Sequence, residues 1–388
     1  MARACKSAEI NVRSIPYSCQ SVTAADIRAV VNVLRSDFLT QGPAIPAFEK
    51  ELARTAGTRY CAVFSSGTAA LHGACAAAGL GKGDEVIVPA LTFAASANAV
   101  LYVGAKPVFA DVDIETGNID PHDVERKITK RTRSIISVDY AGRPADYTAL
   151  RRIAKKHKLL LIADAAHSLG ASYKGRPVGS LADMTMFSFH PVKSITTGEG
   201  GAIATNSKEF YIKLLAFRHH GIVKDRTLFK KKHAPAWHQE MQSLGYNYRL
   251  TDIQAALGLS QLKRLRAHIA KRRALAHRYK KLASSIPGLI LPPSDSKDAH
   301  SAWHLFPIRV AEPSARARVF NALRNVGIAV QVHYLPVYLH PYYQKLGYGK
   351  ELCPRAESFY ASEISIPLFP DLTLREQDRV IRELRKVL

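Results

Sequence analysis

The chain has 388 residues, of which 47% are hydrophobic, and its formal net charge is +23 at pH 7. This length and apolar content allow two buried cores and argue against a disordered chain. The five cysteines are scattered, without the paired spacing of a disulfide framework or a zinc site. No apolar run approaches the roughly 20 residues that span a bilayer, and residues 1–10 lack the apolar core of a secretory signal. We therefore expect a protein of the reducing cytoplasm, with no bound metal and no membrane partner.

The first predicted elements are a short strand at 59–64 and a helix of small residues at 69–78, joined by Ser65-Ser66-Gly67-Thr68. A serine cap followed by glycine leaves backbone N–H groups free at the positive end of the helix, where a phosphate is stabilised. Taken alone, the segment is an ordinary capped helix. The glycine-rich stretch 79–84 follows a helix and precedes a strand, so we predict a turn there and not a dinucleotide-binding loop.

Further along, strand-like runs alternate with helical patterns. Strands are predicted at 86–88, 107–110, 134–138 and 159–163, and helices at 147–157 and at 121–129, the latter capped by Asp120. This rhythm predicts an α/β fold, with a mostly parallel sheet and helices on both faces. Functional loops should then gather at the carboxyl ends of the strands, where Ser66, Phe93, Asp164 and Ser188 fall.

The C-terminal part differs in pattern. The chain becomes helical from 254 to 282, is broken by prolines at 287 and 292–293, and forms a smaller mixed α+β domain from 301 that closes with a helix at 374–388. We expect a large domain at 1–262 and a small C-terminal domain at 263–388.

Asp164 and Lys193 carry the chemistry that decides the interpretation. Asp164 begins Asp164-Ala165-Ala166-His167-Ser168 after a buried strand, and Lys193 lies in the segment 188–201. A lysine amine can form an imine with an aldehyde and later move a proton as a base. A carboxylate at the end of a buried strand can keep a pyridine nitrogen protonated, so that the ring accepts an electron pair. The pair predicts an enzyme that uses pyridoxal 5'-phosphate (PLP), with the phosphate at 65–68.

Each residue has a simpler explanation when it is taken alone. Lys193 would be a solvated loop lysine, His167 a hydrogen-bonded core histidine and Phe93 a core residue. Asn247 and Arg249 would belong to a loop before an amphipathic helix. It is their combination that favours a PLP site.

The chain resembles the sugar-nucleotide aminotransferases of fold type I, in the aspartate aminotransferase superfamily. The resemblance rests on residues 65–68, on 164–168, on the Lys193 segment and on 245–256, Gly-Tyr-Asn-Tyr-Arg-Leu-Thr-Asp-Ile-Gln-Ala-Ala, and it runs from about residue 15 to the C-terminus. Within the family, residues 138–142, 257–262 and 331–338 look closest to the transaminase of pseudaminic acid biosynthesis.

The resemblance implies a role for each site residue. Lys193 would bind the PLP aldehyde covalently and Asp164 would contact the pyridine nitrogen. His167 would lie near the phenolic oxygen of the cofactor, with Phe93 and Ala166 on the two faces of its ring. The phosphate would be held by Ser66, Gly67, Thr68, Ser188 and, from a neighbouring subunit of a homodimer, Asn247. The sugar nucleotide would meet Arg249, His333 and Tyr334.

The implied reaction takes an amino group from glutamate to the C4 ketone of a UDP-linked 6-deoxy-N-acetylhexosamine. The alternatives are another nucleotide keto sugar, aminated at C3 or C4, and a protein of another class, a basic DNA-binding regulator.

The residues present argue against other classes of protein. A sugar dehydratase of the same fold would carry histidine in place of Lys193, and an inactive homologue would be expected to lose Lys193 or Asp164. We find neither zinc spacing nor an aromatic platform for single strands, so we expect no nucleic-acid partner.

The positive charge has two concentrations. A helical pattern at 264–282 places leucines on one face and cations on the other, which predicts a solvated basic face. A second cluster, Lys230 to Lys232, lies in a polar stretch that we expect to form a loop over the active site, where it would steer an anionic substrate.

Overall fold

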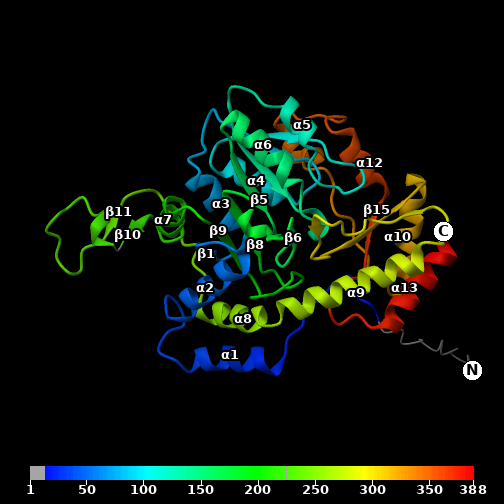
Figure 1. The fold of residues 1–388 in the computed structure, drawn as a ribbon, viewed down its shortest axis with the longest axis horizontal. Helices are drawn as coiled ribbons and strands as arrows, with labels where there is room; N and C mark the ends of the chain where they lie inside the picture. The colour runs from blue at the N-terminus through cyan, green and yellow to red at the C-terminus, as the bar shows by residue number, and fades with distance from the viewer. Residues whose placement is uncertain (1–13, 224) are drawn as a thin grey trace, which may run out of the picture.

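The computed structural model of the protein describes residues 14–223 and 225–388, so Cys5 and the segment 1–10 lie outside the described residues. A seven-stranded sheet, in the order β1-β9-β8-β5-β4-β2-β3, forms the centre of the large domain (Figure 1). Its strands are β1 (Tyr60–Phe64), β2 (Glu85–Pro89), β3 (Lys106–Ala110), β4 (Thr132–Val138), β5 (Leu160–Asp164), β8 (Met184–Ser188) and β9 (Gly201–Thr205).

The sheet is mostly parallel, as the sequence predicts. Strand β2 pairs in parallel with β3 and β4, and β5 pairs in parallel with β4 and β8. Strand β9 is antiparallel to both of its neighbours, β1 and β8. The chain passes from β8 to β9 through a loop without a crossover helix, and such a connection returns antiparallel. That loop contains Lys193.

Helices cover both faces because successive strand residues point to opposite sides. Val63, Ile87 and Leu161 enter one apolar core, whereas Ala62, Val86 and Ile162 enter the other. The first core is covered by α2 (Ala44–Ala56), α6 (Tyr147–His157) and α8 (Asp252–Leu262). The second is covered by α3 (Gly67–Ala77), α4 (Ala94–Tyr102), α7 (Lys208–Phe217) and α12 (Pro354–Ser362). Helix α1 (Ala24–Leu34) packs on α8.

A third core belongs to the C-terminal part. The antiparallel strands β12 (Leu289–Ile290), β14 (Phe306–Val310) and β15 (Glu363–Ile366) pack with α9 (Leu265–Ala283), α10 (Arg316–Asn325) and α13 (Leu374–Val387). Ile15, near the N-terminal end of the described chain, pairs with Ile328 and joins this core. The boundary between domains at 262/263 stays a prediction.

Several shorter elements lie between these helices and strands. They are α5 (Pro121–Arg126), α11 (Pro341–Lys345), β6 (Ser172–Tyr173), β7 (Arg176–Pro177) and β13 (Ala299–His300). The predicted cap of α5 is confirmed, since the Asp120 carboxylate accepts the His122 N–H at 2.9 Å. Among the described residues, every helix is too short or too polar to cross a lipid bilayer.

The solvated basic face predicted at 264–282 is wrong at one position. Arg272 of α9 is only 1% exposed. Its guanidinium donates to the carbonyl oxygens of Leu368 (2.8 Å) and His304 (3.1 Å), so it is surrounded by main-chain acceptors and not by water. Arg272 shares a face with the buried residues Ile269 and Ala276.

The loop predicted over the active site does not lie over the cavity of its own chain. Lys230 to Lys232 lie in the excursion between β10 (Ile222–Val223) and β11 (Glu240–Met241), which projects away from the body of its own chain (Figure 1). The segment pairs with itself as a two-stranded ribbon, and the Glu240 carboxylate accepts the N–H groups of Lys230 (2.8 Å) and Lys231 (3.0 Å). It therefore stands out from the sheet and does not fold back over it.

Candidate active site

A cavity of about 400 Å³ lies at the carboxyl ends of β1, β2, β5 and β8. All predicted site residues line it except Asn247 and Arg249. Those that it brings together are Ser66, Gly67, Thr68, Phe93, Asp164, Ala166, His167, Ser188, Lys193, His333 and Tyr334. Residues more than 260 positions apart in the sequence therefore meet in one cavity.

Asp164 ends β5 and is 5% exposed. The Ser96 hydroxyl donates to its Oδ2 at 2.6 Å, and the Ala166 N–H donates to its Oδ1 at 3.1 Å. Burial raises the pKa of the Asp164 carboxyl, while these two donors and the charge of Lys193 act in the opposite direction. The carboxylate is held rigidly and can still accept a hydrogen bond from a cationic ring N–H.

Lys193 lies in the loop from β8 to β9, and α9 supports this loop on both sides of the lysine. The Arg272 Nη2 group donates to the carbonyl oxygen of Val192, and His268 Nδ1 donates to that of Ser194, both at 3.4 Å. Burial and the nearby charge of Arg272 lower the pKa of Lys193 to about 8, although Asp164 acts to raise it. The amine is thus closer to neutral form than an exposed lysine.

The start of α3 lies at the cavity, where the sequence predicts a phosphate cradle. Ser66 is its N-cap, and its Oγ accepts the Ala69 N–H at 3.1 Å. A Cβ atom at Gly67 would lie 3.2 Å from the Ser188 Cβ, closer than most side-chain contacts allow. The glycine lets the helix end approach Ser188 and leaves N–H groups facing the cavity for an anion.

His167 is buried with one nitrogen bonded and one free. Its Nε2 lies 3.2 Å from the Tyr334 hydroxyl, while its Nδ1 has no partner among the described residues. The ring of His304 lies 4.3 Å from that of His167, centroid to centroid. Burial lowers the pKa of both imidazoles well below the usual value, so both are neutral at pH 7.

His333 is fixed from behind by β15. Its Nδ1 lies 2.8 Å from the Ser365 Oγ, and its main-chain N–H donates to the Glu363 carboxyl at 2.7 Å. The Tyr140 hydroxyl donates to the His333 carbonyl oxygen at 2.6 Å. Burial and the charge of Lys193 lower the pKa of His333 to about 3.

Asn247 and Arg249 do not reach this cavity within one chain. Asn247 is exposed and pairs with His219 through main-chain atoms. The Arg249 Nη1 atom lies 2.9 Å from the His219 Nδ1 atom, in a separate hollow that Gln41 and Gly42 also line. Their contribution to a neighbouring subunit stays a prediction.

The residues of the cavity fit PLP. An acid stands at the end of β5, an amine lies in the facing loop, and a capped helix end lies where a phosphate would bind. The unpartnered buried Nδ1 of His167 leaves a polar contact for a bound group. Phe93 is 61% exposed at the cavity, which suits a side chain that covers an aromatic ring.

The sequence did not single out Ser96, Arg272, Glu363 and Ser365. For Arg272 a signal exists, because it shares the helical stripe of Leu265, Ile269 and Ala276 and so interrupts an apolar face. Ser96 is a buried polar residue in the mostly apolar helix α4, which is a weaker signal. For Glu363 and Ser365 the only signal is that they lie two residues apart on a strand and so share one face of it.

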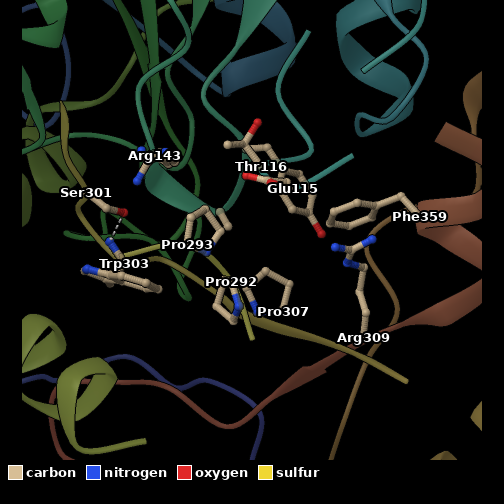
Figure 2. A pocket seen from close by; sticks show the side chains of 12 residues that line it. Glu115, Thr116, Arg143, Pro292, Pro293, Ser301, Trp303, Pro307, Arg309 and Phe359 are labelled. Carbon is tan, nitrogen blue, oxygen red and sulfur yellow. Dashed lines mark hydrogen bonds between the residues drawn. The ribbon is translucent and has the colours of Figure 1, made fainter. Parts of the chain in front are cut away.

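Another hollow lies between Trp303, Pro307, Arg309 and Phe359 (Figure 2). Its free volume of about 20 Å³ holds about one water molecule. It is too small for a cofactor or a sugar.

Over residues 20–385, the chain matches the DegT/DnrJ/EryC1/StrS aminotransferase family. It is 39% identical over 379 residues to the spore coat polysaccharide biosynthesis protein SpsC of Bacillus subtilis (strain 168), covering 96% of this chain and 97% of that one. It is 40% identical over 368 residues to the UDP-4-amino-4,6-dideoxy-N-acetyl-beta-L-altrosamine transaminase of Campylobacter jejuni subsp. jejuni serotype O:23/36 (strain 81-176). This match covers 93% of this chain and 94% of that one. Among solved structures, Helicobacter pylori PseC, an aminotransferase involved in the biosynthesis of pseudoaminic acid, superposes with a TM-score of 0.90 at 35% identity and covers 97% of this chain and 99% of its own. These matches confirm the family resemblance.

Proposed function

The chain belongs to the DegT/DnrJ/EryC1/StrS aminotransferase family, and from that premise we propose that it aminates a UDP-linked 4-keto sugar with glutamate as the amino donor. It is a PLP-dependent sugar aminotransferase of fold type I. The proposed acceptor is UDP-2-acetamido-2,6-dideoxy-beta-L-arabino-hexos-4-ulose, aminated at C4 in pseudaminic acid biosynthesis in the cytoplasm. The similarity to the Campylobacter jejuni transaminase and to PseC supports this substrate.

The observation that carries the proposal is the meeting of Lys193 and Asp164 in one cavity, with the capped end of α3 beside them. PLP, when bound, supplies an electron sink for the carbon that loses its proton. We assign the covalent attachment and the proton transfers to the Lys193 amine, since its pKa of about 8 leaves part of it neutral at working pH.

The other residues of the cavity hold and orient the cofactor and the substrate. Asp164 keeps its carboxylate at the ring nitrogen position because Ser96 and Ala166 fix both of its oxygens. Ser66, Gly67, Thr68 and Ser188 bind the phosphate through hydroxyl and N–H donors. Phe93 and Ala166 enclose the ring, and His167 contacts its phenolic oxygen. His333 and Tyr334 meet the sugar nucleotide from the opposite wall.

The site is completed by a second subunit. Asn247 and Arg249 are assigned to the neighbouring active site of a homodimer, where they contact the phosphate and the sugar nucleotide. Their absence from the cavity of their own chain supports this assignment. In the same way, Lys230 to Lys232 would steer the anionic substrate of the partner.

A panel of nucleotide keto sugars tests the substrate. Purified PLP-loaded protein is mixed with glutamate and with UDP-linked or dTDP-linked 4-keto or 3-keto sugars, and mass spectrometry follows the amino sugar and 2-oxoglutarate. We expect the UDP-linked 4-keto N-acetyl sugar to give the highest kcat/KM. A preference for a 3-keto sugar or for another nucleotide would contradict the proposed acceptor while leaving the aminotransferase intact.

A further inference from the structure

Three side chains of the small domain form one hydrogen-bonded chain that ends at the active-site cavity. Glu363 and Ser365 lie two residues apart on β15, so both project from the same face of that strand. The Ser365 Oγ lies 2.6 Å from the Glu363 Oε1 and 2.8 Å from the His333 Nδ1. Ser365 occupies Nδ1 of His333. Since His333 lines the cavity, Nε2 is the ring nitrogen that remains for a ligand there.

Such a chain couples the proton on the carboxyl to the tautomer of the imidazole. A serine hydroxyl has one proton and can donate it in only one direction. If Glu363 is a neutral acid, it donates to Ser365, Ser365 donates to Nδ1, and Nε2 carries the remaining ring proton. If Glu363 is ionised, Ser365 donates to the carboxylate, Nδ1–H donates to Ser365, and Nε2 is bare.

The surroundings of Glu363 favour the neutral acid. Glu363 is fully buried, and no ion pair of the described chain includes it. The ionisable side chains that face it from neighbouring elements are His333, Tyr334, Tyr140, Arg309 and Arg316.

Both of these arginines are engaged elsewhere. The Arg309 guanidinium lies 5.0 Å from the centre of the Phe359 ring, and Figure 2 shows it turned toward that ring. Arg316 lies over the ring of Tyr360 and donates to the Tyr360 carbonyl oxygen. A buried carboxyl without a partner cation keeps its proton, and burial raises the pKa of Glu363 to about 8.

We propose that Glu363, acting through Ser365, is a positioning residue that keeps His333 in the tautomer with a proton on Nε2, so that His333 donates a hydrogen bond to a substrate oxygen. The identity of the substrate in this inference rests on the proposed function, whereas the tautomer of His333 does not depend on it. Above the pH at which Glu363 ionises, one proton leaves to solvent, the ring proton moves from Nε2 to Nδ1, and the donor in the cavity becomes an acceptor.

The tautomer can be measured in the full-length, cofactor-free protein without any substrate. Histidine is labelled with ¹⁵N, and the signals of His333 are those that disappear in His333→Gln. At pH 7 we expect a protonated, pyrrole-type Nε2 and a bare, pyridine-type Nδ1. Near pH 9 we expect a bare Nε2 and a protonated Nδ1. A bare Nε2 at pH 7 would overturn the proposal, whatever sugar the enzyme accepts.

Two variants and a control separate the relay from a structural role. The amide of Glu363→Gln can donate to Ser365 at every pH, so Nε2 should stay protonated at pH 9. Ser365→Ala breaks the chain, so both tautomers should appear at pH 7. Glu312→Gln, at an exposed glutamate of the same domain, should match the wild type. Reversal at pH 9 in Glu363→Gln, or an unchanged pattern in Ser365→Ala, would overturn the proposal.

Kinetics give a second readout. For the UDP-linked keto sugar, Ser365→Ala should raise KM about twofold or more at pH 7, because part of the protein then lacks the Nε2–H donor. The KM of the wild type should rise about tenfold between pH 7 and 9, as the neutral form of Glu363 is lost, and that rise should be absent in Glu363→Gln. An equal rise in both proteins would contradict the role of Glu363.

Discussion

Lys193 shows how opposing effects set the state of one amine. Burial and the Arg272 charge favour the neutral amine, and the Asp164 carboxylate favours the ammonium. With a pKa of about 8, roughly a tenth of the amine is neutral at pH 7, which is several hundred times more than for an ordinary lysine. A base and nucleophile needs this neutral form, whereas an exposed lysine would hold its proton.

This balance predicts the pH dependence of labelling in the cofactor-free protein. The rate at which acetic anhydride modifies Lys193, read by peptide mass mapping, should have its midpoint near pH 8, below the ordinary lysine value of 10.5. In Asp164→Asn the midpoint should fall, because the carboxylate that stabilises the ammonium is gone. Asp37→Asn, at an exposed aspartate, should leave the midpoint unchanged. An upward shift in Asp164→Asn would refute this account of the site.

Some of these residues could be read from the sequence and some could not. Asp164 and Lys193 stand in contiguous motifs whose chemistry is legible without a fold. Glu363 acquires meaning only because β15 brings it beside His333, 30 positions earlier in the chain. The charge of Arg272 suggests a solvated position, whereas its place on the apolar face of α9 puts it inside the protein.

Among the elements, α3 links the fold to the cofactor most directly. Its N-terminus points into the cavity because β1 ends at Phe64 and the chain turns at Ser65 and Ser66. Ser66 is therefore a helix cap, and we propose that it is also a phosphate ligand. The helix α7 offers a matched case, because its N-cap Ser207 accepts the Phe210 N–H at 3.2 Å and lies away from the cavity.

The two caps can be compared directly. Ser66→Ala and Ser207→Ala should each lower the free energy of unfolding of the cofactor-free protein by about 1 kcal/mol, the usual value of a serine cap. Only Ser66→Ala should also weaken PLP binding, by about tenfold, since only that cap loses a phosphate donor. Thermal melting measures the first effect and fluorescence titration the second. Equal PLP affinities in the two variants would remove Ser66 from the phosphate site.

Several strands and helices of the large domain could be predicted because their apolar periods are regular. The predicted helix at 147–157 has the observed bounds, and the strand at 134–138 lies inside β4. The long helical stretch at 254–282 divides at residues 263–264 into α8 and α9, a break that no proline or glycine marks. The antiparallel direction of β9 depends on pairing between distant strands, which local pattern does not encode.

At the scale of the whole molecule, the chain exposes a surface that its own fold does not use. The ribbon of β10 and β11 projects outward and carries the exposed apolar residues Trp237, Met241 and Leu244 (Figure 1). Large apolar side chains gathered on a projecting ribbon are typical of a protein interface. This arrangement agrees with our proposal that the site is shared between subunits and that the segment at Asn247 serves the partner.

Mixed dimers decide whether the site is shared. Lys193→Ala and Asn247→Ala should each be nearly inactive alone, the second because PLP affinity falls about ten- to a hundredfold with the lost phosphate contact. When the two variants are refolded together, half of the dimers are hybrids, and each has one site with both wild-type residues, so about a quarter of wild-type activity should return. A mixture of Lys193→Ala with Lys193→Ala/Asn247→Ala should regain none. If Lys193 and Asn247 acted in the same chain, no hybrid would contain a complete site, and the first mixture would also stay inactive.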